Sequence, residues 1–409
     1  MRRGGYNSPT GHSLRRRVVD PPARLVEWLR KMSRPFDATR MVFERAGVQP
    51  LKAAKEALLG QWGKHLSGRM LSCEWNSEEG WSSPVIRDSR PLALSPAASC
   101  LHYALQCFEG MKAYKGDDGK IRLFRPELNA KRFNTSLKRL AMPELPEDEF
   151  VEALKLFVRD QEDWIPEGEG YAGYLRPTAI ATDAALGVGP PQNVTFFALL
   201  SPVGPYFHAG FKPVSVYADS VNVRAWPSGH GAYKIGANYA PSIRPQKAAA
   251  KLGASQVLYC TAEGQRQRLT EVGSMNIFVL WTDAQTGRLT LSTPLLHRGD
   301  ILPGVTRRSV LELAMKTDHK DRLVVDDQTD IYIDQLQLAA KEGRLLELFG
   351  AGTAALICPI KSILLQNDEQ IQAPNADHVG PLVTRLLTDL GDIHYGRSPL
   401  SKDWCQEVP

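Results

Sequence analysis

One lysine of this 409-residue chain lies in a segment made almost entirely of small and aromatic residues. Residues 228–241 read SGHGAYKIGANYAP, and Lys234 has no charged residue between Arg224 and Arg244. Small neighbours allow a lysine to lie against backbone, where limited water disfavours the ammonium form and lowers its pKa. A neutral amine can attack a carbonyl and form a Schiff base. The alternative is a solvated lysine in a glycine-rich turn, and the rest of the chain decides between them.

Three further segments could complete a site for a phosphorylated aromatic ring. Glu271 precedes the apolar segment 277–281, and a carboxylate there can keep a pyridine nitrogen protonated. The turn 302–306 precedes a helix-like segment, and the first amides of a helix bind phosphate. Residues 350–355, GAGTAA, can approach an anion closely, and we expect them to follow a helix that ends over 345–349. Each segment alone also fits an ordinary turn, but with a reactive lysine they are what a pyridoxal phosphate enzyme needs.

Composition narrows the class of protein. The 43% hydrophobic and 23% charged residues are typical of a globular chain, and the length suffices for two domains. The formal charge is +5, and no basic run is interleaved with aromatic residues, so we expect no nucleic acid partner. No apolar stretch reaches the length of a membrane span. The six cysteines contain no CxxC pair, which argues against a metal site or a disulfide framework.

The periodicity of the apolar residues predicts a mixed α/β protein of two domains with mixed sheets. Prolines and glycines cluster over 201–213 and mark the boundary. We expect an N-terminal extension over 1–36, a small domain over 37–203, an interdomain loop over 204–213 and a large domain over 214–409. The expected strands lie near 70–75, 120–124, 174–180, 194–200, 214–218, 255–260, 276–281 and 289–293. The expected helices cover 126–141, 150–159, 241–252 and a segment after 306, and residues 263–268 are expected to be a polar hairpin connection.

The N-terminal extension is basic. Five arginines precede the first acid, Asp20, as is typical of an organelle transit segment. A disordered basic tail is the alternative, and Met32 could be an internal start. We therefore expect a soluble intracellular protein and leave mitochondrial and cytoplasmic locations open.

Several blocks of this sequence, in order, resemble the branched-chain amino acid aminotransferases. These are fold type IV pyridoxal phosphate enzymes, and the chain resembles their longer eukaryotic form from about 70 to 398. The blocks are FEGMKAY at 108–114, LFRP at 123–126, YLRPT at 174–178, YKIGANY at 233–239, TEVGSMN at 270–276, LPGVTR at 302–307, GTA at 352–354 and IHYGR at 393–397. The resemblance implies two mixed-sheet domains joined by an interdomain loop, with the cofactor bound by the large C-terminal domain.

The resemblance also implies which residues bind pyridoxal 5'-phosphate. Lys234 would be the catalytic residue, holding the cofactor covalently and then moving protons. Glu271 would pair with the pyridine nitrogen and Tyr239 with the phenolic oxygen. The remaining cofactor-binding residues would be Arg132, Thr353 and the amides of Val305 and Thr306 for the phosphate, Leu302 for the ring face, and Ser274, which stands where threonine is usual.

For the substrate, the resemblance implies a pocket that accepts an aliphatic side chain and a carboxylate in turn. Tyr103 and the turn at Ala354 would bind the α-carboxylate. Tyr174, Arg176 and Tyr206 would line the side-chain pocket, and Arg176 would help to admit the second carboxylate of glutamate.

The implied activity is transfer of the amino group of L-leucine, L-isoleucine or L-valine to 2-oxoglutarate, giving a 2-oxo acid and L-glutamate. The implied partners are small amino acids and 2-oxo acids, and the implied assembly is a homodimer with pocket residues reaching across. One alternative is another fold type IV activity, such as a D-amino acid aminotransferase, an aminodeoxychorismate lyase or an enzyme of a specialised metabolite pathway. The other is a binding protein without catalysis.

The chain departs from the family pattern at two places. Residues 228–231 read SGHG where the family usually has two glycines, a variable residue and a glycine. His230 is therefore either a solvated loop histidine or a substrate contact. Cys358 ends the segment ALIC where mammalian relatives have a CxxC pair, so we expect that redox switch to be absent.

Overall fold

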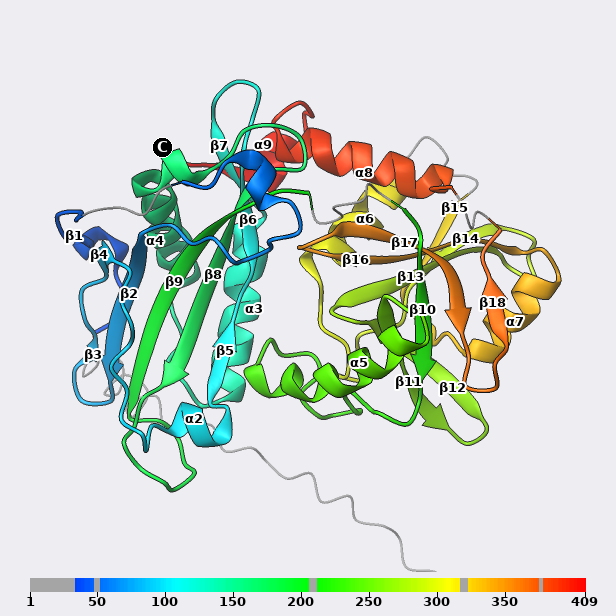
Figure 1. Ribbon diagram of the computed structural model, residues 1–409, viewed down its shortest axis with the longest axis horizontal. Coiled ribbons are helices and arrows are strands. Elements are labelled where there is room, and N and C mark those ends of the chain that lie inside the picture. The colour runs from blue at the N-terminus through cyan, green and yellow to red at the C-terminus, as the bar shows by residue number, and fades with distance from the viewer. Residues whose placement is uncertain (1–33, 48–51, 206–211, 317–322, 375–377) are drawn as a thin grey trace, which may run out of the picture.

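The computed structural model describes residues 34–47, 52–205, 212–316, 323–374 and 378–409. Figure 1 shows two α/β bodies side by side, each built around one large sheet. Tyr206 and nearly all of the expected N-terminal extension lie outside the described residues. Within the described ranges, none of the helices is both long enough and apolar enough to cross a membrane.

The N-terminal body is a ten-stranded sheet with two long helices on it. Along α3 (Pro126–Arg139), Ala130, Phe133 and Leu137 recur at helical spacing and are buried. They face α4 (Glu147–Asp160), and the rings of Phe133 and Phe150 lie 5.4 Å apart. The strands are β1 (Val42–Phe43), β2 (Arg69–Asn76), β3 (Gly80–Trp81), β4 (Val85–Asp88), β5 (Gln106–Phe108), β6 (Met111–Lys115), β7 (Ile121–Phe124), β8 (Ala172–Ala181), β9 (Asn193–Val203) and β19 (Cys405–Glu407). A short helix, α2 (Ser99–Tyr103), precedes β5.

The C-terminal body is a nine-stranded mixed sheet. Its strand β10 pairs in parallel with β11 and β17, whereas β13 pairs antiparallel with β14 and β16. The strands are β10 (Val214–Asp219), β11 (Gln256–Glu263), β12 (Arg266–Val272), β13 (Met275–Thr282), β14 (Leu289–Ser292), β15 (Leu323–Asp326), β16 (Leu345–Gly352), β17 (Leu356–Leu364) and β18 (Gln370–Gln372). The helices are α5 (Ile243–Lys251), α6 (Val305–Lys316), α7 (Ile333–Lys341), α8 (Pro381–His394) and α9 (Ser401–Trp404). The predicted mixed α/β class is confirmed.

The end of the chain returns to the N-terminal body. After α8 and α9, strand β19 pairs antiparallel with β7. The ring of His394, at the end of α8, stacks on Tyr114 of β6 with centroids 4.2 Å apart. The expected C-terminal domain, residues 214–409, therefore contributes one strand to the other sheet, and this pairing links the two bodies.

One local expectation was wrong, and the bounds of another were too wide. Residues 345–349 do not end a helix: they begin β16, which lies between β13 and β17. A short apolar run fits a buried strand as well as a helix, and pairing on both sides decides the matter. The hairpin expected over 263–268 is present, but its connection is only residues 264–265, because β11 continues to Glu263 and β12 begins at Arg266. Arg268 is fully buried in β12, between Glu263 of the neighbouring strand and Asp300, which lies 32 residues further along the chain.

Candidate active site

A cavity of about 600 Å³ lies between the two bodies. The N-terminal body lines it from β5, β8 and α3, and the C-terminal body from the lysine segment, the end of β12, the start of α6 and the turn after β16. Among the residues predicted from the sequence, those lining the cavity are Arg132, Tyr174, Arg176, Lys234, Tyr239, Glu271, Ser274, Leu302, Val305, Thr306, Thr353 and Ala354. Segments far apart in the chain therefore meet at one place.

Lys234 is held by its backbone from the N-terminal body. Its N–H donates to Ser136 Oγ on α3 at 2.9 Å, and its carbonyl accepts from the amide of Phe108 at 3.1 Å. The side chain is half-buried, and its Nζ lies 3.2 Å from the hydroxyl of Tyr239 and 5.0 Å from the ring centre of Phe108. Because both the N–H and the carbonyl of Lys234 are hydrogen-bonded, its backbone is fixed where the side chain enters the cavity.

His230 supports the loop before Lys234. Its Nδ1 is hydrogen-bonded to the side-chain oxygen of Asn238, whose amide group donates to the carbonyls of His230 and Tyr233 at 2.9 and 2.8 Å. The ring is half-buried beside Trp226 and is not among the residues lining the cavity. The structure therefore assigns His230 neither of its two predicted roles: it holds the loop together.

Glu271 lies at the end of β12 and is almost fully buried, with 2% of its surface exposed. Its Oε2 forms an ion pair with Arg224 at 2.5 Å, and its Oε1 accepts from the amide of Leu302 at 3.3 Å. Burial raises the pKa of Glu271, and the charge of Arg224 opposes that rise. A carboxylate of raised pKa is a strong acceptor for a protonated ring nitrogen. The sequence analysis missed Arg224, although it is the nearest charge before Lys234.

Arg132 is buried at 7% exposure and is oriented by a fully buried acid that the sequence analysis also missed, Glu109. Arg132 Nε and Nη2 donate to the two oxygens of Glu109 at 2.7 and 2.8 Å, and Nη1 donates to the carbonyl of Pro303 at 3.1 Å. Burial raises the pKa of Glu109, but Arg132, Lys234 and Asn129 together hold it below its usual range. A guanidinium has five N–H donors, so Arg132 keeps donors for an anion in the cavity. In the sequence, the only sign of this role of Glu109 is an acidic residue between the apolar segments that form β5 and β6.

The start of α6 lies on the cavity and has the groups that could bind an anion. The first amides of a helix have no partner within it, and its dipole favours negative charge there. Val305 and Thr306 supply those amides, and both residues are buried. A Cβ on the preceding Gly304 would collide with Asn276 Oδ1, so the close approach requires glycine. The turn with Thr353 lies on the same cavity.

The residues predicted to bind substrate do not all come together. Arg176 Nε and Nη2 donate to the hydroxyl of Tyr174 at 3.1 and 2.8 Å, and both residues line the cavity. The carbonyl of Ala354 accepts from Lys112 Nζ at 2.9 Å, and burial lowers the pKa of Lys112 to about 7. Tyr103 is 41% exposed, donates to the carbonyl of Leu186 and is not among the lining residues. Tyr206 lies outside the described residues.

The residues present fit pyridoxal phosphate. Lining cations outnumber lining anions, with Arg132, Arg176 and Lys234 against Glu271, and this charge suits a phosphate and a substrate carboxylate. The helix start, Gly304 and Thr353 suit the phosphate, the buried Glu271 suits the ring nitrogen, and Leu302 offers an apolar surface.

Comparison with known proteins agrees with this geometry. Residues 106–363 match the family model of amino-transferase class IV. The branched-chain-amino-acid aminotransferase of Dictyostelium discoideum is 47% identical over 344 residues, which are 84% of this chain and 88% of that protein. That of Monosiga brevicollis is 44% identical over 374 residues, covering 91% of this chain and 93% of that protein. A solved structure, a T.th. branched-chain amino acid aminotransferase with pyridoxamine 5'-phosphate, aligns with a TM-score of 0.62 and 26% identity over 82% of this chain and 98% of that chain. The chain therefore belongs to the class IV aminotransferases and, within them, to the branched-chain-amino-acid aminotransferases.

Proposed function

We propose that the protein uses pyridoxal 5'-phosphate to transfer the amino group of L-leucine, L-isoleucine or L-valine to 2-oxoglutarate. The products are a 2-oxo acid and L-glutamate. The observation that carries this proposal is one cavity lined by the amine of Lys234, the buried carboxylate of Glu271 and the first residues of α6. Those are an amine for proton transfer, a partner for a ring nitrogen and a phosphate site.

The residues of the chain divide the work. When bound, the cofactor supplies a ring that takes up the electron pair left by removal of the substrate α-proton. Lys234 Nζ accepts that proton and later returns one, and the hydroxyl of Tyr239 fixes the position of Nζ through their 3.2 Å contact. Glu271 holds a proton on the ring nitrogen, and Arg224 and the amide of Leu302 keep Glu271 in place. Arg132, the start of α6 and Thr353 hold the phosphate.

One pocket must accept two kinds of side chain. Phe108, Trp62 and the ring of Tyr174 offer apolar surface to an aliphatic side chain. Arg176 lies 4.8 Å from the ring centre of Phe108, with its donors on the Tyr174 hydroxyl. This arrangement keeps the guanidinium hydrogen-bonded while an aliphatic side chain is present and leaves donors for the second carboxylate of 2-oxoglutarate. The Thr353–Ala354 turn would bind the α-carboxylate common to both substrates.

Tyr103 supports a homodimer. Its ring is exposed, and so are the apolar side chains of Leu101, two residues before it, and of Leu186, whose carbonyl accepts its hydrogen bond. An exposed apolar patch of this kind is typical of an interaction surface. We infer that a second copy covers it and that Tyr103 contributes to the cavity of the other subunit.

A different amino acid substrate was the main alternative. The departure from the family pattern at residues 228–231 left room for it, with His230 as a possible substrate contact. The ring of His230 contacts Asn238 and is not among the residues lining the cavity, so it gives this alternative no support. For the compartment, the names of two relatives from Rattus norvegicus place one in mitochondria and one in the cytosol. A transit role for residues 1–36 stays a prediction.

The test is the absorbance spectrum of the pure protein during titration with L-leucine and then with L-alanine. A cofactor band that changes with leucine, and much less with alanine, is the expected result. A cofactor band indifferent to leucine would refute the substrate assignment, and the absence of any cofactor band would refute the cofactor assignment.

A further inference from the structure

One short loop, residues 298–302, contacts the segment that carries Lys234. The amide of Ser228 donates to the carbonyl of Arg298 at 2.8 Å, and the amide of Ala232 donates to that of Gly299 at 3.0 Å. A Cβ on Gly231 would collide with the carbonyl oxygen of Asp300. Backbone therefore packs directly on backbone just before the lysine, and any shift of loop 298–302 shifts that segment.

The same loop and the residue after it contact two more residues of the site. The amide of Leu302 donates to Glu271 Oε1 at 3.3 Å, and the carbonyl of Pro303 accepts from Arg132 Nη1 at 3.1 Å. Residues 298–303 therefore contact the Lys234 segment, Glu271 and Arg132 together.

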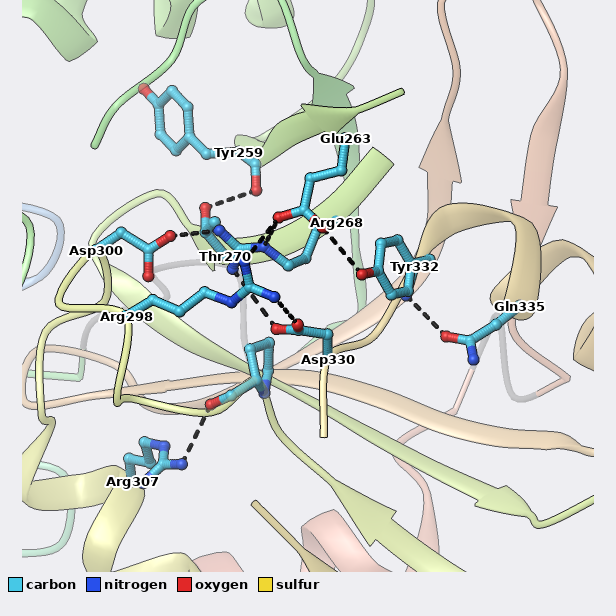
Figure 2. Close-up of polar contacts among 11 residues, drawn as sticks. Tyr259, Glu263, Arg268, Thr270, Arg298, Asp300, Arg307, Asp330, Tyr332 and Gln335 are labelled. Carbon is cyan, nitrogen blue, oxygen red and sulfur yellow. Dashed lines mark hydrogen bonds and ion pairs between the residues drawn. The ribbon is translucent and has the colours of Figure 1, made fainter. Parts of the chain in front are cut away.

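A cluster of charged side chains contacts the loop, as Figure 2 shows. Arg268 Nη2 is bonded to Asp300, and Arg268 Nε donates to Glu263 Oε1 at 2.8 Å. Arg298 extends the cluster by bonding to Asp330 and by donating to Glu263 Oε1 at 3.1 Å. Each of the two charged side chains of loop 298–302 is therefore attached to this cluster.

One ion pair of this cluster is buried to a degree that is unusual for charged groups. The side chains of Arg268 and Asp300 are both fully buried. Burial raises the pKa of Glu263, but hydrogen bonds from Arg268 and Tyr332 hold it below its usual range. A fully buried ion pair is poor evidence for stability, because removing two charges from water offsets their attraction. Its directional bonds instead favour a single arrangement of the groups it joins.

Arg268 and Asp300 do not belong to the catalytic machinery itself, since neither lines the cavity. Arg268 precedes Glu271 by three residues on β12, so the loop is attached to this strand twice, through Asp300 and through Leu302. We propose that the Arg268–Asp300 pair is a positioning device that sets Lys234 and Glu271 relative to each other by fixing loop 298–302. That Lys234 and Glu271 act in the reaction rests on the proposed function. That the Arg268–Asp300 pair fixes their positions does not.

The test compares Asp300→Asn with a matched control in the full-length protein. Asparagine keeps the size of the side chain but removes the charge that faces Arg268. The control is Asp334→Asn, which makes the same change in an exposed pair, Asp334 with Arg266, and leaves Arg266 in place over the ring of Tyr332. In the protein without cofactor, we would measure hydrogen exchange at the amides of Ser228 and Ala232. With cofactor added, we would measure kcat and KM for leucine and the pH dependence of the cofactor absorbance.

We expect Asp300→Asn to exchange both amides at least about 10-fold faster than wild type and to lower kcat by about 10- to 100-fold. We expect KM to change less than twofold and the midpoint of the absorbance titration to move, because Glu271 shifts with the loop. The Asp334→Asn control should match wild type in every measurement. Should Asp300→Asn fail to fold, Asp330→Asn, which removes the partner of Arg298, takes its place with the same readouts.

The proposal is overturned if Asp300→Asn equals the control in amide exchange, in kcat and in the absorbance titration. A lower unfolding temperature of Asp300→Asn would not rescue it, because that would show a structural role alone. The proposed function fails separately, when wild type and control show no turnover of leucine. In that case the exchange of Ser228 and Ala232 still decides whether loop 298–302 depends on Asp300.

Discussion

Replacing Glu109 with glutamine tests how the structure orients Arg132. Glu109 is fully buried and accepts hydrogen bonds from Arg132 Nε and Nη2 and from Asn129 Nδ2, all between 2.7 and 2.8 Å. Glutamine has nearly the same volume, so no cavity is created. Its amide group would turn a donor toward the donors of Arg132, and a buried guanidinium would lose its counter-charge.

The magnitude follows from that burial. Removing one partner of a buried ion pair costs about 3–5 kcal/mol, because the remaining charge is uncompensated. A matched surface pair is Glu152 with Lys155 on α4, at 3.1 Å, where Glu152→Gln should cost no more than about 0.5 kcal/mol. Urea unfolding of both variants at pH 7 without cofactor measures the difference. We also expect Glu109→Gln to bind pyridoxal phosphate more weakly, since Arg132 would no longer be held at the phosphate site.

The pH dependence of this loss has a definite sign. The folded-state pKa of Glu109 lies below its ordinary value of 4.5, so the unfolded chain takes up a proton first as pH falls. Stability from ionised Glu109 is therefore complete above pH 4.5 and declines as pH falls toward the folded-state pKa. The gap between wild type and Glu109→Gln should be widest near neutrality and narrow on acidification. A gap no larger than that of Glu152→Gln, or one independent of pH, would refute this reasoning.

Four further predictions concern single residues. Lys234→Ala should abolish transamination of leucine, measured as glutamate formed from 2-oxoglutarate, and turnover at the wild-type rate would contradict its role. Burial lowers the pKa of His394 to about 3, so between pH 7 and pH 5 the unfolded chain takes up a proton that the folded protein does not. The wild type should therefore lose about 2 kcal/mol of stability over this range, and His394→Phe should not. Equal losses for the two proteins on urea unfolding would argue against a buried neutral ring. Burial lowers the pKa of Lys112 to about 7, so between pH 7 and 10 the unfolded chain keeps a proton that the folded protein has lost. Wild-type stability should therefore rise by up to about 1.4 kcal/mol per pH unit over this range, and Lys112→Met should flatten the rise. A rise that persists in Lys112→Met would place the lysine in water. Gly231→Ala would force a methyl group against the carbonyl of Asp300 and should cost about 1–3 kcal/mol and reduce cofactor retention; wild-type values for both would show that loop 298–302 yields freely.

Much of the candidate site could be predicted because its residues lie in short segments of unusual composition. Lys234 stands out as an isolated charge among small residues, and the turn at 302–306 precedes a helix whose start faces the cavity. The strand and helix periods follow from which side chains are buried, as Phe133 and Leu137 illustrate on α3. These signals are contained within a few residues.

The residues that were missed have meaning only through partners far away in the chain. Glu109 is an ordinary acid until Arg132 of α3 lies against it, and Arg224 is an ordinary loop arginine until Glu271 pairs with it. Arg268 lies in the polar stretch 263–268, and nothing near it in sequence indicates that Asp300 lies beside it. Hydrophobic periodicity reports burial of apolar groups, but it does not report which charges compensate each other inside the protein.

The family and the class of fold were predicted correctly from the chain alone, and Lys234 was singled out in the same way, because each depends on residue types within short blocks. Tertiary structure alone decided that 345–349 is a strand, that Tyr103 points away from its own cavity, and that the C-terminal strand joins the N-terminal sheet. It also decided which buried charges are paired. The physical reason is that strand pairing and charge compensation are long-range: they depend on where the whole chain places two groups, and a single block of sequence does not contain that information.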